Sequence, residues 1–241
     1  MSLPMLAVPE DTITLLSIPK PVTYRPYLVG EEKILLMAQA AQEQNKDTKE
    51  VEKAIKQIIQ RCTFQKIDVD ALPSFDIEYL FLQLRAKSVN NIIHAQFRCK
   101  HVVDEKPCDT LVPVTININD IKLTVPEGHS KKVMLSDTIG VTMKYPTAAV
   151  YEDYLSSPNQ LGILEACLDT VFTVGGEVNE VKEQPPAEVK RFIESLTLGN
   201  VEKIRAFFET MPRLAYTFNF KCPACGYAED VTLQGLTDFF D

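Results

Sequence analysis

The sequence predicts an α+β fold, with helices around a small antiparallel β region. In the middle of the chain and near its end, apolar residues alternate with polar ones, and this period of two is typical of β-strands. In the stretches on either side, apolar residues recur at every third or fourth position, which is the period of an amphipathic helix. We therefore expect a β-rich middle that is flanked by helices.

Two cysteine pairs lie within the alternating stretches. The first pair is Cys99 and Cys108, and the second is Cys222 and Cys225. Because a strand pattern precedes and follows each pair, both are predicted at the tips of β-hairpins. Two such tips that meet form a tetrahedral four-thiolate zinc site, as in a zinc ribbon, and Gly226 allows the tight turn after the second pair. We predict a structural zinc ion at a zinc-ribbon-like four-cysteine site, split by a long insertion.

Other interpretations of these cysteines are less favoured. A redox Cys-x-x-Cys site requires a helix N-terminus to lower a thiol pKa, whereas a strand pattern follows Cys225. A disulfide requires an oxidising compartment, and the sequence shows no secretion signal. Four unrelated buried thiols are also less favoured, because all four cysteines fall at predicted turn tips. His101 and His129 are alternative ligands, although a solvated loop position is favoured for each. A closed four-cysteine site would stabilise the fold and leave no position for a metal-bound water.

The composition is that of an ordinary soluble globular protein, with 45% hydrophobic and 24% charged residues. The formal net charge of −8 argues against nucleic acid as the main partner, because phosphate binding requires a basic surface. No apolar run approaches the length of a membrane span, and the first residues lack the pattern of a secretion signal. We therefore expect a protein that folds in the cytoplasm, with Cys62 and Cys167 as core thiols on helix faces.

Residues 1–30 are predicted to form an extended N-terminal arm. Residues 1–29 contain five prolines together with many Leu, Ile, Val and Tyr residues, which favours an extended segment or an edge strand. Residues 22–29 are predicted to contain a short strand. Such an arm covers the protein's own core or pairs with a neighbouring chain, and the first interpretation is favoured.

Residues 31–91 are predicted to form a helical region. A helix over 31–45 begins with two glutamates, which suit the positive end of a helix dipole, and a second helix is capped by Asp47. A third helix begins with Ser74 as N-cap. From Phe75 to Leu84 it is apolar almost all round, so we expect the central core helix, an apolar face for a partner being the alternative. Three nearby acidic residues are interpreted as capping and solvated: Asp68, Asp70 and Asp76.

Residues 92–241 are predicted to form the zinc-ribbon-like β region, at 92–125 and 214–235, with further strands and helices inserted at 126–213. Inside this region we expect strands at 121–125 and 139–145, and helices at 147–155, 161–172, 187–196 and 199–210. Gly175-Gly176 marks a tight turn in a small hairpin. For Phe239 and Phe240 near the end of the sequence, core packing and docking to a partner are equally open.

The sequence lacks the motifs that would indicate an enzyme. It has no Gly-rich phosphate loop, no serine nucleophile elbow and no His-Glu-x-x-His motif. Its three histidines, His94, His101 and His129, are not spaced for acid–base catalysis. We therefore expect no catalytic residues and no cofactor other than the structural zinc.

Several segments are distinctive in combination. They are 24–33 (YRPYLVGEEK), 72–88 (LPSFDIEYLFLQLRAKS), 139–146 (IGVTMKYP), 207–212 (FFETMP) and 222–225 (CPAC). With these segments the chain resembles the baseplate hub and hub-assembly proteins of T-even-type contractile-tailed bacteriophages, over nearly its whole length. The resemblance implies a non-enzymatic protein of tail morphogenesis, either a component of the central hub or a factor that helps the hub to form.

From the residues and the resemblance together, we expect a structural or assembly protein that binds other tail and baseplate hub proteins. It would act in the host cytoplasm during assembly, and in the virion tail baseplate if it stays in the particle. A symmetric assembly would also allow a homo-oligomer. Two alternatives stay open: a zinc-ribbon adaptor protein in transcription, and a thiol oxidoreductase that uses Cys222 and Cys225.

Overall fold

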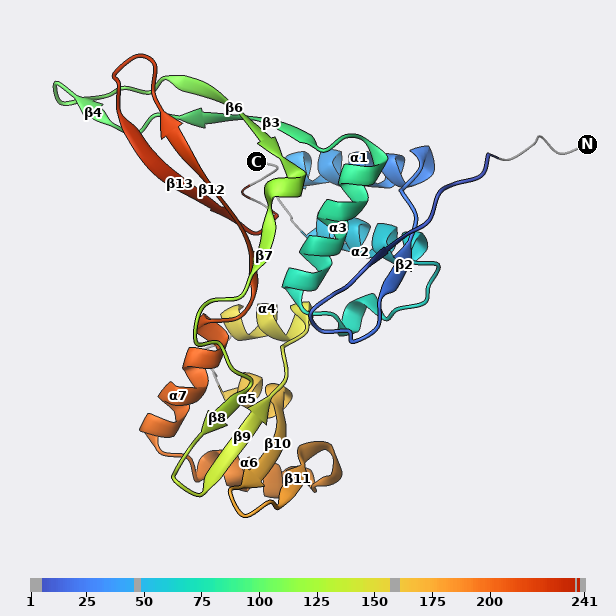
Figure 1. Ribbon diagram of the computed structural model, residues 1–241, viewed down its shortest axis with the longest axis vertical. Helices are drawn as coiled ribbons and strands as arrows, with labels where there is room; N and C mark the ends of the chain where they lie inside the picture. The colour runs from blue at the N-terminus through green and yellow to red at the C-terminus, as the bar shows by residue number, and fades with distance from the viewer. Residues whose placement is uncertain (1–5, 46–48, 157–160, 237, 239–241) are drawn as a thin grey trace, which may run out of the picture. The chain divides into compact units, whose positions relative to one another are not determined.

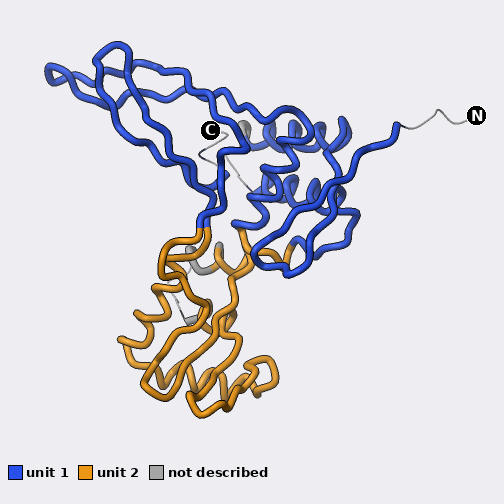
Figure 2. The backbone as a smooth tube through the Cα atoms, in the orientation of Figure 1, with its two compact units in different colours: residues 1–69, 75–124, 213–241 blue, residues 70–74, 125–212 orange. Residues whose placement is uncertain are grey.

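The computed structural model describes residues 6–45, 49–156, 161–236 and 238. The chain divides into two units, which Figure 2 shows in different colours. Unit 1 contains residues 1–69, 75–124 and 213–241, and unit 2 contains residues 70–74 and 125–212. Both combine helices with small antiparallel sheets, which confirms that part of the predicted fold class. Asp47, Phe239 and Phe240, for which the sequence suggested roles, lie outside the described residues.

The first half of unit 1 is an extended segment followed by three helices (Figure 1). Two short strands, β1 (Asp11–Ile13) and β2 (Val22–Tyr24), pair antiparallel within the segment. The helices are α1 (Val29–Asn45), α2 (Lys49–Cys62) and α3 (Ser74–Ser88), with a 3-10 turn η1 (Val69–Ala71) before α3. Five apolar side chains of the segment are buried, so it covers the protein's own core as predicted: Ile13, Leu15, Val22, Tyr24 and Tyr27.

Asp76 in the first turn of α3 anchors this N-terminal segment. Its carboxylate accepts hydrogen bonds from the backbone N–H groups of Leu16 (3.1 Å) and Ser17 (2.8 Å). Asp76 is fully buried, so the prediction that it is solvated is wrong. The reason is that the chain sixty residues upstream lies over the helix end, which no local pattern reveals.

We expect Asp76→Ala to lower the free energy of unfolding by about 2 kcal/mol, because it leaves two backbone donors without their charged acceptor. Urea unfolding measures this change. The exposed turn residue Asp137 provides the control, since Asp137→Ala should stay within about 0.5 kcal/mol of the wild type. Equal effects of the two substitutions would contradict the anchoring role.

The second half of unit 1 consists of two long hairpins that pack on α3. The first joins β3 (Ile92–Arg98) to β6 (Leu111–Asn117) and carries a small hairpin of β4 (Val102–Val103) and β5 (Lys106–Pro107) in its loop. The second joins β12 (Arg213–Lys221) to β13 (Ala228–Gln234). After a 3-10 turn η2 (Ile118–Asp120), β7 (Lys122–Thr124) pairs with the start of β12. Leu82 of α3 is fully buried in the core that both hairpins share, consistent with the predicted central helix.

Unit 2 is a four-stranded antiparallel sheet with the order β11-β10-β9-β8. Its strands are β8 (Lys132–Met134), β9 (Ile139–Met143), β10 (Leu168–Thr173) and β11 (Val178–Glu180). Its helices are α4 (Ala148–Ser156), α5 (Leu161–Cys167), α6 (Pro186–Glu194) and α7 (Leu198–Glu209), with a 3-10 turn η3 (Val181–Glu183). The core lies between one face of the sheet and side chains of α5, α6 and α7.

The prediction of a helix over 161–172 is wrong in its second half. Helix α5 ends at Cys167, and the next residue begins β10. Residues 161–172 are apolar enough to suit either a helix or a buried strand, so the pattern alone does not decide. Pairing with β9 on one side and β11 on the other selects the strand. The short strand β8 was not predicted, because three residues give too little alternation.

His129 joins the two segments through which unit 2 is inserted between β7 and β12. Its Nδ1 lies 3.0 Å from Thr210 Oγ1, and its Nε2 lies 2.9 Å from the Tyr145 hydroxyl. Because the Thr210 hydroxyl donates to the Ala206 carbonyl (2.6 Å), it accepts from Nδ1–H, and Nε2 then accepts from Tyr145. The neutral imidazole also stacks on the Phe207 ring, so the prediction of a solvated histidine is wrong.

This arrangement makes the stability of unit 2 sensitive to mild acid. Burial, and then the Lys131 charge, lower the pKa of His129 below its usual 6.5. The folded state therefore binds fewer protons, so the free energy of unfolding should fall as the pH drops below about 6.5, by at most about 1.4 kcal/mol per pH unit. Denaturant unfolding between pH 5 and 8 tests this against His129→Gln, which should lack that slope. Parallel profiles of the two proteins would contradict it.

Candidate metal centre

The four predicted cysteine ligands lie at the tips of the two long hairpins. Cys99 directly follows β3, and Cys108 directly follows β5. Cys222 directly follows β12, and Cys225 lies in the turn before β13. Figure 1 shows β4 and the β12–β13 turn at the same end of the hairpin pair. The structure therefore brings together all four residues, although the two pairs are more than a hundred positions apart in the sequence.

The four sulfur atoms have nearly the spacing of a tetrahedral thiolate site. Cys99 Sγ lies 3.7 Å from Cys225 Sγ, and Cys108 Sγ lies 3.7 Å from Cys222 Sγ. All four sulfurs lie within 4.8 Å of one another, and all four cysteines are free. Four thiolates at about 2.3 Å from one zinc ion, at the corners of a tetrahedron, would lie about 3.8 Å apart. The group could therefore hold a single metal ion.

The first tip achieves this geometry despite its eight intervening residues. The extra residues fold into the β4–β5 hairpin, whose turn residues Asp104 and Glu105 both have positive φ, as a tight two-residue turn requires. Two backbone hydrogen bonds then close the loop: Cys108 N–H donates to the His101 carbonyl (2.8 Å), and Asp109 N–H to the Cys99 carbonyl (3.1 Å). These bonds bring Cys99 and Cys108 close together at the base of the β4–β5 hairpin, although eight residues separate them in the sequence.

The second tip is a tight turn of the kind that the sequence predicted. Gly226 has a φ of 74°, a conformation that costs little only for glycine. Its N–H donates to the Cys222 carbonyl (3.0 Å), while Cys222 N–H donates to the Tyr227 carbonyl (2.8 Å). Cys222 and Cys225 therefore lie between a strand and a turn. This placement lacks the helix N-terminus by which redox Cys-x-x-Cys motifs lower a thiol pKa.

The backbone of the second tip favours a thiolate. The N–H groups of Cys225 and then Ala224 lower the pKa of Cys222 to about 6, against the effect of burial. Burial, in contrast, raises the pKa of Cys99 to about 12. Four neighbouring thiolates without a cation would repel one another, so the cluster is suited to a positive ion that keeps all four deprotonated.

An apolar layer surrounds the sulfurs. Cys99 and Cys222 are buried, and the Phe220 side chain packs against both of them. The His101 ring stacks on Tyr227 at 4.5 Å between ring centroids, and its Nδ1 is buried with no hydrogen-bond partner among the described residues. Tyr227 also packs against the cluster, and its stacking with His101 is a contact that nothing in the sequence pattern indicated.

The other candidate residues lie elsewhere. His129 binds Thr210 and Tyr145 in unit 2 and is not part of the cysteine cluster. Cys62 in α2 and Cys167 in α5 are fully buried core thiols, as predicted. Burial raises the pKa of Cys62 to about 11 and that of Cys167 to about 12, so both stay protonated and unreactive at neutral pH.

Comparison with known families identifies the chain's relatives. The sequence model of the family described as T4 bacteriophage base plate protein matches residues 8–241. The chain belongs to this family. The match covers nearly the whole sequence and includes both units and the cysteine cluster, so the predicted resemblance is confirmed. A search of the curated proteins and a search of the solved structures each find no match.

Family membership indicates a phage baseplate protein, located in the virion tail baseplate and in contact with other phage proteins. None of the described helices combines the length and the apolar character needed to cross a membrane.

Proposed function

We propose that this family member is a structural or assembly protein of the central hub of the baseplate. It acts through protein–protein contacts, without catalysis, and joins the other hub proteins in the host cytoplasm during assembly. The observation that carries the proposal is the family match over residues 8–241. The acidic charge of −8 supports protein rather than nucleic-acid partners.

We also propose that Cys99, Cys108, Cys222 and Cys225 hold one structural zinc ion. The tetrahedral sulfur spacing supports zinc, and four thiolates fill its coordination sphere, so the ion would stabilise the fold without binding substrate. In this proposal residues 126–213 are an insertion into the ribbon, residues 1–30 are the arm and residues 31–91 are the helical region.

The two alternative functions have less support. A transcription adaptor would not explain the match of the whole chain to a baseplate family. A thiol oxidoreductase would need Cys222 at a helix N-terminus, whereas Cys222 directly follows β12 and a turn and a strand follow Cys225. The Cys-x-x-Cys sulfurs also lie beside the two sulfurs of the other hairpin, which supports a shared metal site.

Quantitative mass spectrometry of purified phage tails and of infected-cell lysate tests the hub proposal. A fixed ratio to other baseplate proteins in tails would show a building block of the particle. Presence in lysate as a complex with hub proteins, together with absence from tails, would show an assembly factor. The proposal fails if the protein associates with tail proteins in neither fraction.

A further inference from the structure

The sheet of unit 2 has one face that is open among the described residues. The helices α5, α6 and α7 pack on the side of Val141, Met143 and Leu168. On the opposite side, Met134 is 42% exposed and Val178 is 61% exposed. Because side chains alternate across a sheet, the strand register determines which residues share this outer face.

The first row of the outer face is apolar and crosses all four strands. The register aligns Met134 (β8), Gly140 (β9), Phe172 (β10) and Val178 (β11). A Cβ atom on Gly140 would overlap the Phe172 ring and lie 2.9 Å from Met134 Sδ. The absence of a side chain at Gly140 therefore leaves room for the Phe172 ring over the neighbouring strand. Met134, Phe172 and Val178 thus form an apolar row across the sheet, against which a second sheet could pack face to face.

The second row is polar and carries opposite charges at its two ends. It aligns Lys132 (β8), Thr142 (β9), Thr170 (β10) and Glu180 (β11). The lysine and the glutamate thus lie on the two edge strands of the sheet, and Glu180 also forms an exposed ion pair with Lys182 of the same copy (3.2 Å). Between them are two threonines, small residues that do not hinder the close approach of another sheet.

We propose that this outer face binds the same face of a second copy of the chain, about a two-fold axis parallel to the strands. Such an axis places β8 of one copy opposite β11 of the other. Each row of the face then lies opposite the same row of the second copy. Lys132 then faces Glu180 of the partner subunit twice in the dimer, and the apolar rows cover each other. A two-fold interface requires a self-complementary surface, and this charge pattern satisfies that requirement.

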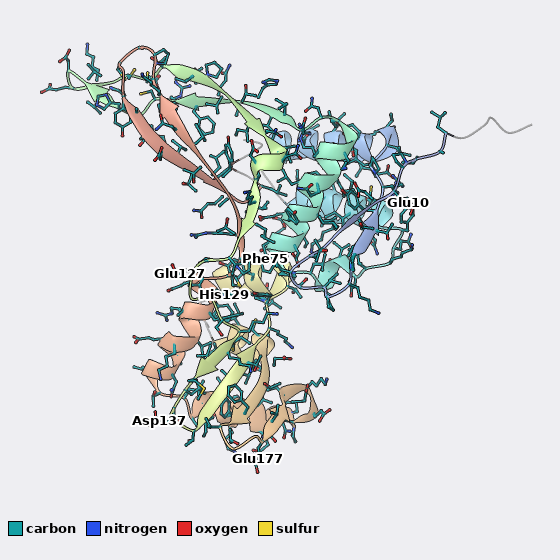
Figure 3. The ribbon with its side chains drawn as sticks, viewed as in Figure 1. Glu10, Phe75, Glu127, His129, Asp137 and Glu177 are labelled. Carbon is teal, nitrogen blue, oxygen red and sulfur yellow. The ribbon has the colours of Figure 1, made fainter. Side chains whose placement is uncertain are left out.

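One feature of the face opposes the dimer. Asp137 and Glu177 lie in the two hairpin turns at the end of unit 2 away from His129 (Figure 3). The same axis brings Asp137 of one copy near Glu177 of the partner subunit, and these like charges repel. The dimer should therefore tighten a few-fold when Asp137→Asn and Glu177→Gln are combined.

Sedimentation equilibrium of the full chain, from micromolar to millimolar concentration, tests the proposal. The wild type should dimerise, and Lys132→Glu and Glu180→Lys should each raise the dissociation constant by at least about tenfold. An equimolar mixture of the two variants should restore association, because every facing pair in the mixed dimer is again of opposite charge. Circular dichroism serves as the control that each variant is folded.

The inference is overturned if the wild type stays monomeric, or if the two variants dimerise as the wild type does. It is also overturned if the mixture associates no better than either variant alone. The result is independent of the hub proposal, since it concerns the purified chain without other tail proteins.

Discussion

Cys222→Ser is expected to release the metal ion and to lower the free energy of unfolding by about 5 kcal/mol or more, since a structural zinc site contributes its binding energy directly to folding. Cys99→Ser should have the same effect, because each substitution removes one of four ligands. The hairpins β3–β6 and β12–β13 should lose their protection from hydrogen exchange together, since the proposed ion would join one to the other. Thermal unfolding and zinc content per chain measure both consequences.

Cys167→Ala is the matched control for this experiment. It also removes a fully buried cysteine sulfur, but this sulfur lies in the core of unit 2 and does not belong to the four-cysteine cluster. It should keep one zinc per chain and be destabilised only by the cavity, by about 1–3 kcal/mol. A Cys222→Ser or Cys99→Ser protein that kept both its zinc and its melting temperature would rule out the four-thiolate site.

Glu31→Gln is expected to lower the free energy of unfolding by about 3 kcal/mol or more. Glu31 is buried at the start of α1, where its carboxylate accepts from Arg25 Nη2 (3.1 Å) and from Leu28 N–H (2.9 Å). Burial alone would raise its pKa, but these donors lower the pKa below its usual value. Removing one partner leaves the largely buried Arg25 charge uncompensated, which is the expensive case for an ion pair.

The paired substitution Arg25→Met with Glu31→Leu should recover most of this loss, because it removes both charges together. Urea unfolding of Arg25→Met, of Glu31→Leu and of the double variant gives the coupling energy of the pair. Additive effects would show that the two charges act independently. The loss in the Glu31→Gln protein would then have another cause, such as the missing helix cap.

The sequence was most informative where local pattern and tertiary structure agree. The period of two before and after each cysteine pair predicted both hairpin tips, and the apolar residues almost all round the helix from Phe75 to Leu84 predicted the central helix. The prediction that the two hairpin tips meet in space came from the four-thiolate coordination of zinc rather than from any sequence pattern. The β4–β5 hairpin in the eight-residue loop between Cys99 and Cys108 was not predicted, because it has only two residues in each strand.

Other features depend on contacts between distant segments and could not be predicted. β10 is a strand because β9 and β11 pair with it, and Asp76 is buried because Leu16 and Ser17 lie over it. His129 was interpreted as solvated because it lies in a Pro- and Gly-containing turn. Its partners Tyr145 and Thr210 are 16 and 81 positions away, and no spacing rule connects them.

The separation of the two cysteine pairs also affects the order of events during biosynthesis. Cys108 and Cys222 are 114 positions apart, so the ribosome adds all of residues 125–212 after the first pair and before the second. At about 5–20 residues per second, that interval lasts on the order of 6–20 s. During this time Cys99 and Cys108 are exposed to competing metals and oxidants with half of their site missing. Rapid folding of unit 2 would bring Cys222 and Cys225 near Cys99 and Cys108 sooner. The time needed to synthesise and fold the insertion would therefore set when the complete four-cysteine site can bind its metal.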